Sequence, residues 1–183
     1  MLKKETYLLK IIKSFAILIL LFSLSSSGLK AQETDYKAYS LYVYNFMKYI
    51  EWTENQNQGD FVIVIFGKSN IQKELQKLAF QKKIRGRNIV IKSINKIEEI
   101  NDCDLLYLSS EKSSMIKEIN LKLTNKSSLV VGEKDGLAKK GAALSFATLE
   151  NDELSFDINK KIINQQKLKI SNSLIKLGSV VVE

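Results

Sequence analysis

Short apolar runs separated by segments of helical periodicity fill the middle of the chain, and this alternation constrains the fold most strongly. The first run, FVIVIF at residues 61–66, has no polar side chain, which is typical of a strand covered on both faces. Further strand-like runs occur at residues 88–94, 105–108 and 129–131. Because helical segments lie between successive runs, the order predicts a largely parallel sheet with helices on both faces.

The helical segments of this region begin at polar residues that are typical of helix N-termini. Ser69 is followed three residues later by Gln72, and Asn95 by Glu98, which is the spacing of a capping box. A third helix is expected to begin at Ser110.

The last third of the chain has a different pattern. Residues 142–149 and 154–158 alternate between apolar and polar side chains, and the polar residues 150–153 join them, so we expect an antiparallel hairpin. Residues 159–166 and 171–182 are expected to be helical or partly helical, with the core side chains Ile162, Ile163, Leu174, Ile175 and Leu177. The sequence therefore predicts a single three-layer α/β domain with a mostly parallel central sheet and an antiparallel C-terminal hairpin.

Residues 35–52 form an aromatic-rich first helix that is apolar on almost all sides. One stripe holds Tyr36, Tyr39, Val43, Phe46, Met47 and Ile50, and a second holds Ala38, Leu41, Tyr42, Asn45, Tyr49 and Trp52. Such a helix is usually buried on both sides. Burial inside a single domain is the more frequent outcome, and the alternative is that the second stripe contacts another protein.

The N-terminus has the order of a secretory signal peptide. Four lysines precede an eleven-residue apolar run at 14–24, and small residues then lead to Ala31. The run is too short for a membrane anchor, because eleven helical residues extend about 16 Å against a hydrocarbon core of about 30 Å. We therefore expect residues 1–31 to be removed, leaving a periplasmic domain of residues 32–183 with no direct membrane insertion.

Charge argues against a nucleic-acid partner. The leader contains five Lys and one Glu, so its removal lowers the net charge from +8 to +4. The remaining lysines are scattered and are not interleaved with aromatic side chains as in a nucleic-acid groove.

The residues needed for most catalytic and metal sites are missing. The chain has no His and a single Cys, so His-based catalysis and most zinc sites are excluded. Cys103 is expected to be a buried residue at a strand entrance. No P-loop or dinucleotide fingerprint is present, and we expect no cofactor and no enzymatic activity.

Three charged residues near predicted strand ends are candidates for ligand binding. Arg87, Asp104 and Asp135 could line the crevice that α/β sheets form at strand ends. Turn and capping roles are the more frequent use of Asp at such positions. Arg85 and Arg87 could likewise hold an anion, or form a solvated turn.

Several motifs, in a fixed order, resemble the YfiR family of small exported bacterial proteins. The first helix resembles the family's Tyr-Asn-Phe-x-Lys-aromatic-x-Glu-Trp opening at residues 44–52. The similarity continues at Gly86-Arg87, at residues 103–109, 136–146 and 156–159, and at residues 168–174. Thr53 stands where the family usually has Pro, and the chain has one cysteine where members commonly have several.

The resemblance implies a function that composition alone does not. It implies a non-catalytic periplasmic regulator, able to dimerise, that restrains a membrane signalling receptor such as a diguanylate cyclase or sensor kinase by protein–protein contact. Within the first helix, Tyr42, Asn45, Tyr49 and Trp52 are then the candidate partner-binding residues, since interface hot spots favour Tyr and Trp. The alternative is a periplasmic small-ligand-binding sensor that uses Arg87, Asp104 and Asp135.

Overall fold

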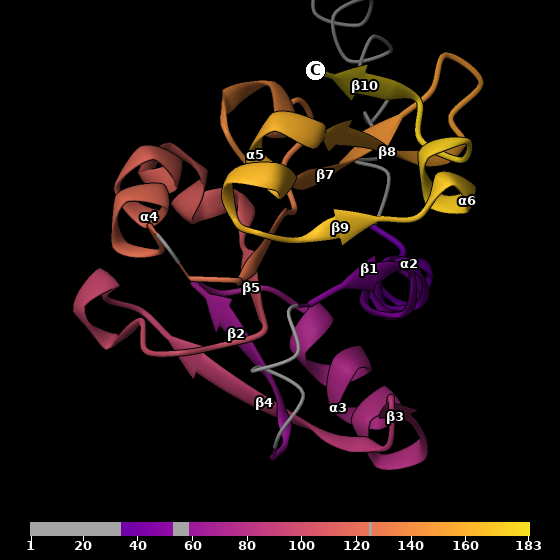
Figure 1. Cartoon of the computed structure of the whole chain (residues 1–183). Helices are drawn as coiled ribbons and strands as arrows, with labels where there is room; N and C mark the ends of the chain where they lie inside the picture. Colours follow the sequence, from indigo (N-terminus) through magenta and orange to yellow (C-terminus); the bar gives the residue numbers. More distant parts are fainter. Residues whose placement is uncertain (1–33, 53–58, 125) are drawn as a thin grey trace, which may run out of the picture. The chain divides into compact units, whose positions relative to one another are not determined.

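The computed structural model describes residues 34–52, 59–124 and 126–183 (Figure 1). The expected signal peptide, residues 1–31, lies outside these ranges, and so does Thr53. Eight strands form the central sheet: β2 (Phe61–Phe66), β3 (Lys83–Ile84), β4 (Arg87–Ile94), β5 (Leu105–Leu108), β6 (Leu129–Gly132), β7 (Leu144–Thr148), β8 (Leu154–Asn159) and β10 (Val180–Val182). Their order across the sheet is β10-β8-β7-β6-β5-β2-β4-β3.

The centre of the sheet is parallel, as the alternation of apolar runs and helical segments predicts. Strand β2 lies between β4 and β5, with Phe61 opposite Ile89 and Ile63 opposite Leu105, and β6 continues in parallel beyond β5. Strand β7 is parallel to β6 and antiparallel to β8, with Phe146 opposite Phe156. The parallel core and the C-terminal hairpin are therefore both confirmed.

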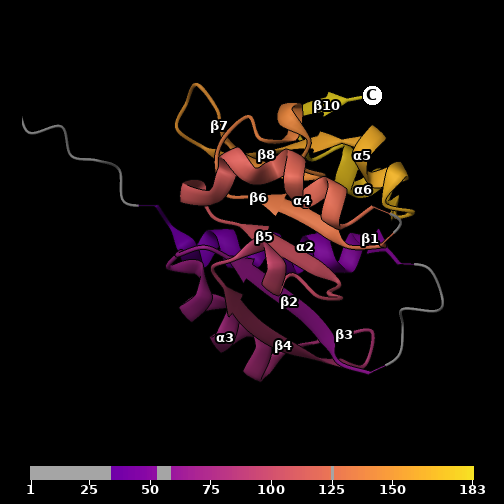
Figure 2. The ribbon, with the colours of Figure 1, turned by 90° about the vertical axis from the view of Figure 1, so that its left-hand side faces the viewer.

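Helices cover both faces of this sheet. The α-helices are α2 (Tyr36–Tyr49), α3 (Ile71–Gln81), α4 (Ile116–Lys122), α5 (Lys160–Gln165) and α6 (Asn172–Ile175), and the 3-10 turns are η2 (Ile97–Glu99), η3 (Ser110–Met115) and η4 (Ala138–Lys140). Figures 1 and 2 place α4 on one side of the sheet and α2 with α3 on the other. This is the expected three-layer arrangement.

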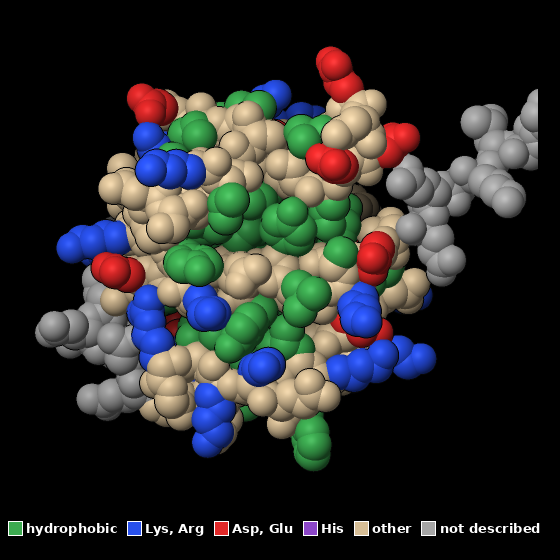
Figure 3. Space-filling model, turned by 90° about the vertical axis from the view of Figure 1, so that its right-hand side faces the viewer, with side chains coloured by type: hydrophobic (Ala, Val, Ile, Leu, Met, Phe, Trp, Pro, Cys, Tyr) green, Lys and Arg blue, Asp and Glu red, His purple; other side chains and the backbone are tan. Residues whose placement is uncertain are grey.

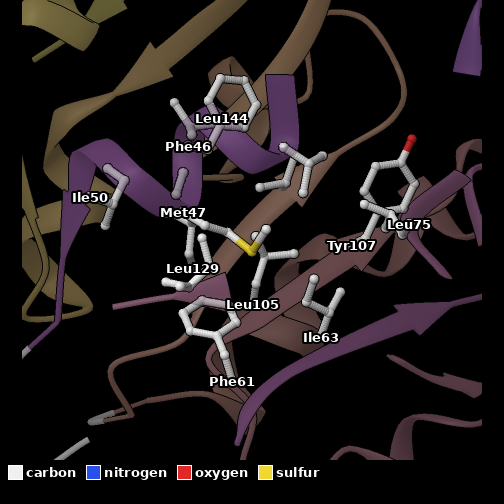
Figure 4. Close-up of a cluster of buried hydrophobic side chains, with 14 of the residues drawn as sticks. Phe46, Met47, Ile50, Phe61, Ile63, Leu75, Leu105, Tyr107, Leu129 and Leu144 are labelled. Atoms are coloured by element: carbon white, nitrogen blue, oxygen red, sulfur yellow. The ribbon is translucent and has the colours of Figure 1, made fainter. Parts of the chain in front are cut away.

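The alternation of side chains along β2 divides the interior into two cores. Phe61, Ile63 and Ile65 face the core beneath α2 and α3, whereas Val64 and Phe66 face the core beneath α4. In the larger core, Met47 of α2 points toward the strand side chains, among them Leu105, Leu129 and Phe61 (Figure 4). Helix α2 is thus fixed to the sheet along its whole length.

Residues 171–182 are expected to be helical or partly helical, and only Asn172–Ile175 is helical, because the last residues form a strand. Helix α6 stops at Ile175, and Val180–Val182 then pairs in parallel with β8 as the edge strand β10. Gly178 packs so closely on Ile158 that an added Cβ would lie 2.6 Å from its Cδ1, and the Ser179 N–H donates to the Phe156 carbonyl at 2.8 Å. Leu177, expected in the core, is 66% exposed.

The first helix is also shorter than expected. It ends at Tyr49, where Ile50 takes an extended backbone with φ −94° and ψ 140°. Ile50–Glu51 forms strand β1, which pairs antiparallel with β9 (Lys169–Ile170) in a separate two-stranded sheet. Because the helix stops here, Trp52 does not continue the helical stripe of Tyr42 and Tyr49.

Neither capping box forms as expected. Asn70 is the N-cap of α3. The Ser69 hydroxyl donates to the carboxylate of Glu133, and its oxygen accepts the Ile71 N–H at 3.3 Å rather than the Gln72 N–H. At residue 95 the segment is a single 3-10 turn, where Glu99 rather than Glu98 accepts the Asn95 and Lys96 N–H groups.

Cys103 is buried at the entrance to β5, as expected. Burial raises the pKa of its thiol from 9.0 to about 11, so the thiol stays protonated at neutral pH. We expect a thiol-specific reagent at pH 8 to label the native protein far more slowly than the unfolded one.

The same pKa shift predicts a pH effect on stability. The unfolded thiol ionises near its ordinary pKa, so the Cys103 contribution to the free energy of unfolding should be complete below pH 9.0 and fall as pH rises toward about 11. Comparing urea denaturation of the wild type and Cys103→Ala across this range isolates the effect. A difference between the two proteins that does not change with pH would contradict it.

Candidate partner-binding surface

One side of α2 packs against the sheet. Its start is fixed by Asp35, whose carboxylate accepts the Ala38 N–H at 3.0 Å. The Tyr39 ring stacks on Phe146 with centroids 3.8 Å apart, and the Phe46 ring meets Phe156 edge-on at 4.9 Å. These contacts commit this side of the helix mainly to packing within the domain.

The opposite side of α2 leaves apolar side chains in solvent. Leu41 is 54% exposed and Tyr49 is 38% exposed, and Asn45 lies between them in sequence and is also exposed. Lys48 lies beside Tyr49, with its Nζ 5.8 Å from the ring centroid. Figure 3 looks onto the side of the molecule that carries α2, where hydrophobic side chains cross the middle of the face among lysines and arginines. We call Leu41, Asn45 and Tyr49 the α2 surface.

Two of the four predicted partner-binding residues have internal roles. Tyr42 is half-buried, and its hydroxyl donates to the Leu154 carbonyl at 3.0 Å. Trp52 is only 6% exposed, and its indole N–H donates to the Asp104 carbonyl at 3.1 Å. Asn45 and Tyr49 therefore lie on the exposed surface, whereas Trp52 lies in the core.

Further apolar side chains are exposed on elements that flank α2. Phe80 of α3 is 94% exposed, and Leu177, just after α6, is 66% exposed. Both helices contact α2. The sequence does contain a signal for Phe80, because it is out of phase with the buried residues Leu75 and Leu78 of the same helix.

The predicted ligand residues Arg87 and Asp104 bind each other. Arg87 Nη1 and Nη2 donate to the two carboxylate oxygens of Asp104 at 2.9 and 2.8 Å, and each side chain is 9% exposed. Arg87 also donates to the carbonyls of Gly59 and Asp60, and Asp104 accepts the Val62 N–H at 2.8 Å. The pair thus joins the starts of β2, β4 and β5 by hydrogen bonds.

Arg85 supports the same corner of the molecule. Its guanidinium donates to the Ile50 carbonyl at 2.7 Å and lies 5.8 Å from the centroid of the Trp52 ring. Both arginines of the Arg85-Gly86-Arg87 turn therefore contact the protein's own backbone at this corner.

Asp135 lies at the other end of the parallel strands, after β6, and is exposed. The structure does not bring it together with Arg87 and Asp104. Near it, the buried Glu133 carboxylate accepts the Ser69 hydroxyl and the Ser110 N–H, and so connects the loops that follow β2, β5 and β6. The three predicted ligand residues do not form one crevice.

The described ranges contain neither of two further kinds of feature, a cluster of metal-ligating side chains and a membrane-spanning helix. No three His, Cys, Asp or Glu side chains within residues 34–52, 59–124 and 126–183 are grouped to hold a metal ion. Within the same ranges, no helix has the length and apolar character needed to cross a membrane.

Comparison with known proteins identifies a family and a fold. The family model described as YfiR/HmsC-like matches residues 36–179. No curated protein matches the sequence.

Two solved structures show a likeness at 12% identity. One is a conserved domain protein from Vibrio cholerae O1 biovar El Tor, with a TM-score of 0.54 over 78% of this chain and 59% of that one. The other is the ABC domain in complex with L-Trp from Streptococcus pneumoniae, with a TM-score of 0.48 over 66% of this chain and 55% of that one. The chain thus spans less than two thirds of the length of either structure, and the first likeness concerns the fold alone.

Proposed function

Because the chain belongs to the YfiR/HmsC-like family, we propose that it is an exported periplasmic protein that binds and restrains a membrane signalling receptor. The family is regulatory and non-catalytic, and it is associated with diguanylate cyclase signalling. For this chain we propose a receptor of that class, a diguanylate cyclase or a sensor kinase. The contact is direct, the chain itself performs no catalysis, and residues 1–31 are the signal peptide that exports it.

The observation that carries this proposal is the α2 surface. Leu41 and Tyr49 hold apolar area in solvent on a helix whose other side is fixed to the core, so the surface is rigid and needs no rearrangement to bind. Phe80 of α3 and Leu177, just after α6, expose further apolar side chains on elements that neighbour α2. Tyrosine is also among the residues that dominate binding energy at interfaces.

Charge around the α2 surface indicates what the receptor presents. Lys37 and Lys48 of α2 are both exposed, and neither forms an ion pair with another described residue. A complementary receptor surface would place carboxylates around an apolar centre. We therefore propose an acidic periplasmic face on the receptor as the occupant of this surface.

Replacing Tyr49 should weaken receptor binding without unfolding the protein. We expect Tyr49→Ala to lose a membrane receptor that the wild type retains in a pull-down from solubilised envelope, with an affinity loss of about 2 kcal/mol or more. Leu121→Ala is the matched control, because Leu121 is 76% exposed on α4, on the other side of the sheet. Mass spectrometry of the retained proteins and calorimetric melting of both variants complete the measurement.

Two outcomes would contradict the proposal. One is equal retention of the receptor by the wild type and Tyr49→Ala. The other is that Tyr49→Ala converts a dimer into a monomer and leaves receptor retention unchanged, which would assign the α2 surface to a second copy of the chain.

The alternative function, a periplasmic small-ligand sensor, requires a pocket rather than a protruding surface. Arg87 and Asp104 are committed to each other, so a ligand site built on all three predicted residues has no support. Asp135 does line a cavity, and none of the residues of the α2 surface lines that cavity.

A further inference from the structure

A cavity of about 580 Å³ lies beyond the end of β6. Its walls come from the β6–β7 connection on one side and from η3 and the start of α4 on the other. The residues that line it are Ser113, Ser114, Ile116, Lys117, Lys134, Asp135, Leu137, Lys139 and Lys140. This volume lies within the range of about 300–1,000 Å³ that is typical of small-molecule sites.

The lining of the cavity is strongly basic. Four of its side chains are lysines, and a single carboxylate, that of Asp135, opposes them. In the described part of the chain, none of these four lysines forms an ion pair or a side-chain hydrogen bond. Unpaired ammonium groups around one hollow produce a positive potential that attracts anions.

Two of the four lysines, Lys139 and Lys140, lie in the turn η4, which hydrogen bonds to the sheet hold in place. The Ala138 N–H donates to the Ser145 hydroxyl at 3.0 Å, and the Asn159 side-chain amide donates to the Ala138 carbonyl at 2.7 Å. Ser145 is 0% exposed and Asn159 is 6% exposed, so both hydrogen bonds lie in the interior. The backbone that carries Lys139 and Lys140 is therefore fixed before any ligand arrives.

Close packing fixes the other side of the same turn. Leu137 lies against Gly132 so tightly that a Cβ on Gly132 would clash with the Leu137 Cδ2. Gly141, at φ +123°, closes the turn, and its carbonyl accepts the side-chain amide of Asn120 at 2.9 Å. Rigid support of this kind lowers the entropic cost of binding.

We propose that this cavity binds a soluble anion with several negative charges, of the pyrophosphate class. Lysine binds phosphate as a point charge. Four ammonium groups in one cavity match the several charges of a diphosphate better than they match the one charge of a carboxylate ligand. The hydroxyls of Ser113 and Ser114 supply further donors. A hollow can enclose a soluble molecule, whereas a membrane presents a flat surface. Asp135 is the single anionic side chain in the lining, and it offsets part of the positive charge.

Calorimetric titration of pyrophosphate into the purified protein, as processed by the cell, tests this site. In about 50 mM salt we expect saturable binding that weakens as salt increases. The double variant K139Q/K140Q should weaken binding at least about tenfold, because it removes two of the four ammonium groups that line the cavity. The matched control is K82Q/K83Q, an adjacent pair of exposed lysines outside the cavity, which should bind like the wild type.

Three results would overturn the proposal. The first is an absence of saturable pyrophosphate binding to the wild type, and the second is an equal loss in K139Q/K140Q and K82Q/K83Q. The third is flotation with phosphatidylglycerol vesicles without binding of pyrophosphate, which would assign these lysines to a membrane surface. If K139Q/K140Q does not fold, K117Q/K134Q removes two charges from the same cavity and replaces it in the comparison.

Discussion

Replacing Asp104 with Ala should lower the free energy of unfolding by about 3–5 kcal/mol, because the change leaves the Arg87 guanidinium buried without its counter-charge. Each side chain of the pair is 9% exposed, so water cannot replace the Asp104 carboxylate as the partner of the guanidinium. The Val62 N–H at the start of β2 would lose its acceptor as well. A loss of this size is a large fraction of the 5–15 kcal/mol that stabilises a typical domain.

Urea denaturation gives the measurement, and the fluorescence of the single tryptophan, Trp52, reports on the same corner of the fold. Asp102→Ala is the matched control. Asp102 is two residues away and also pairs with a cation, Lys126, but its side chain is 93% exposed, so we expect no measurable change.

Removing both charges tests the cause of the effect. Arg87→Leu with Asp104→Leu leaves no uncompensated charge and should recover part of the loss caused by Asp104→Ala. Recovery stays incomplete because Arg87 also donates to two carbonyls near Gly59. A loss below about 1 kcal/mol in Asp104→Ala would contradict the assignment of a buried, stabilising pair.

The parallel core could be predicted from sequence because its signals are local and long. Strand β2 is a six-residue apolar run, and burial on both faces leaves no other place for it. The hairpin of β7 and β8 could also be predicted, since Leu144 and Phe146 in one strand, and Leu154, Phe156 and Ile158 in the other, recur at every second position.

Short strands gave no comparable signal. Strands β1, β3 and β9 have two residues each, and they exist because a distant segment pairs with them. The β-branched residues Val180–Val182 did carry strand propensity. The sequence did not indicate that these residues pair with the edge of β8. That pairing depends on the tertiary packing of Gly178 on Ile158.

The error in the predicted end of the first helix also produced an error in the predicted partner-binding residues. Extending the helical wheel past Tyr49 placed Trp52 on the same stripe as Tyr42 and Tyr49. Once the chain becomes extended at Ile50, the helical phase no longer applies, and Trp52 turns toward Phe61. Leu41 lies on the same predicted stripe and is 54% exposed, although it is not among the four predicted partner-binding residues.

Trp52→Ala should therefore destabilise the protein by about 3–5 kcal/mol, as expected for a large aromatic side chain removed from a core. Its ring meets Phe61 edge-on with centroids 5.2 Å apart, and the Arg85 guanidinium lies 5.8 Å from the centroid of the Trp52 ring. Far-UV circular dichroism during urea denaturation measures the loss, since the variant has no tryptophan to fluoresce. Trp52→Phe keeps an aromatic ring and should lose less, chiefly the hydrogen bond to the Asp104 carbonyl.

Tyr49→Ala is the matched comparison that separates core from interface. Tyr49 is exposed on the α2 surface, so its replacement should change the free energy of unfolding by less than about 1 kcal/mol while weakening receptor retention. Trp52→Ala should do the reverse at temperatures where it is still folded, binding the receptor like the wild type. If Trp52→Ala kept wild-type stability and lost the receptor, Trp52 would belong to the partner-binding surface and not to the core.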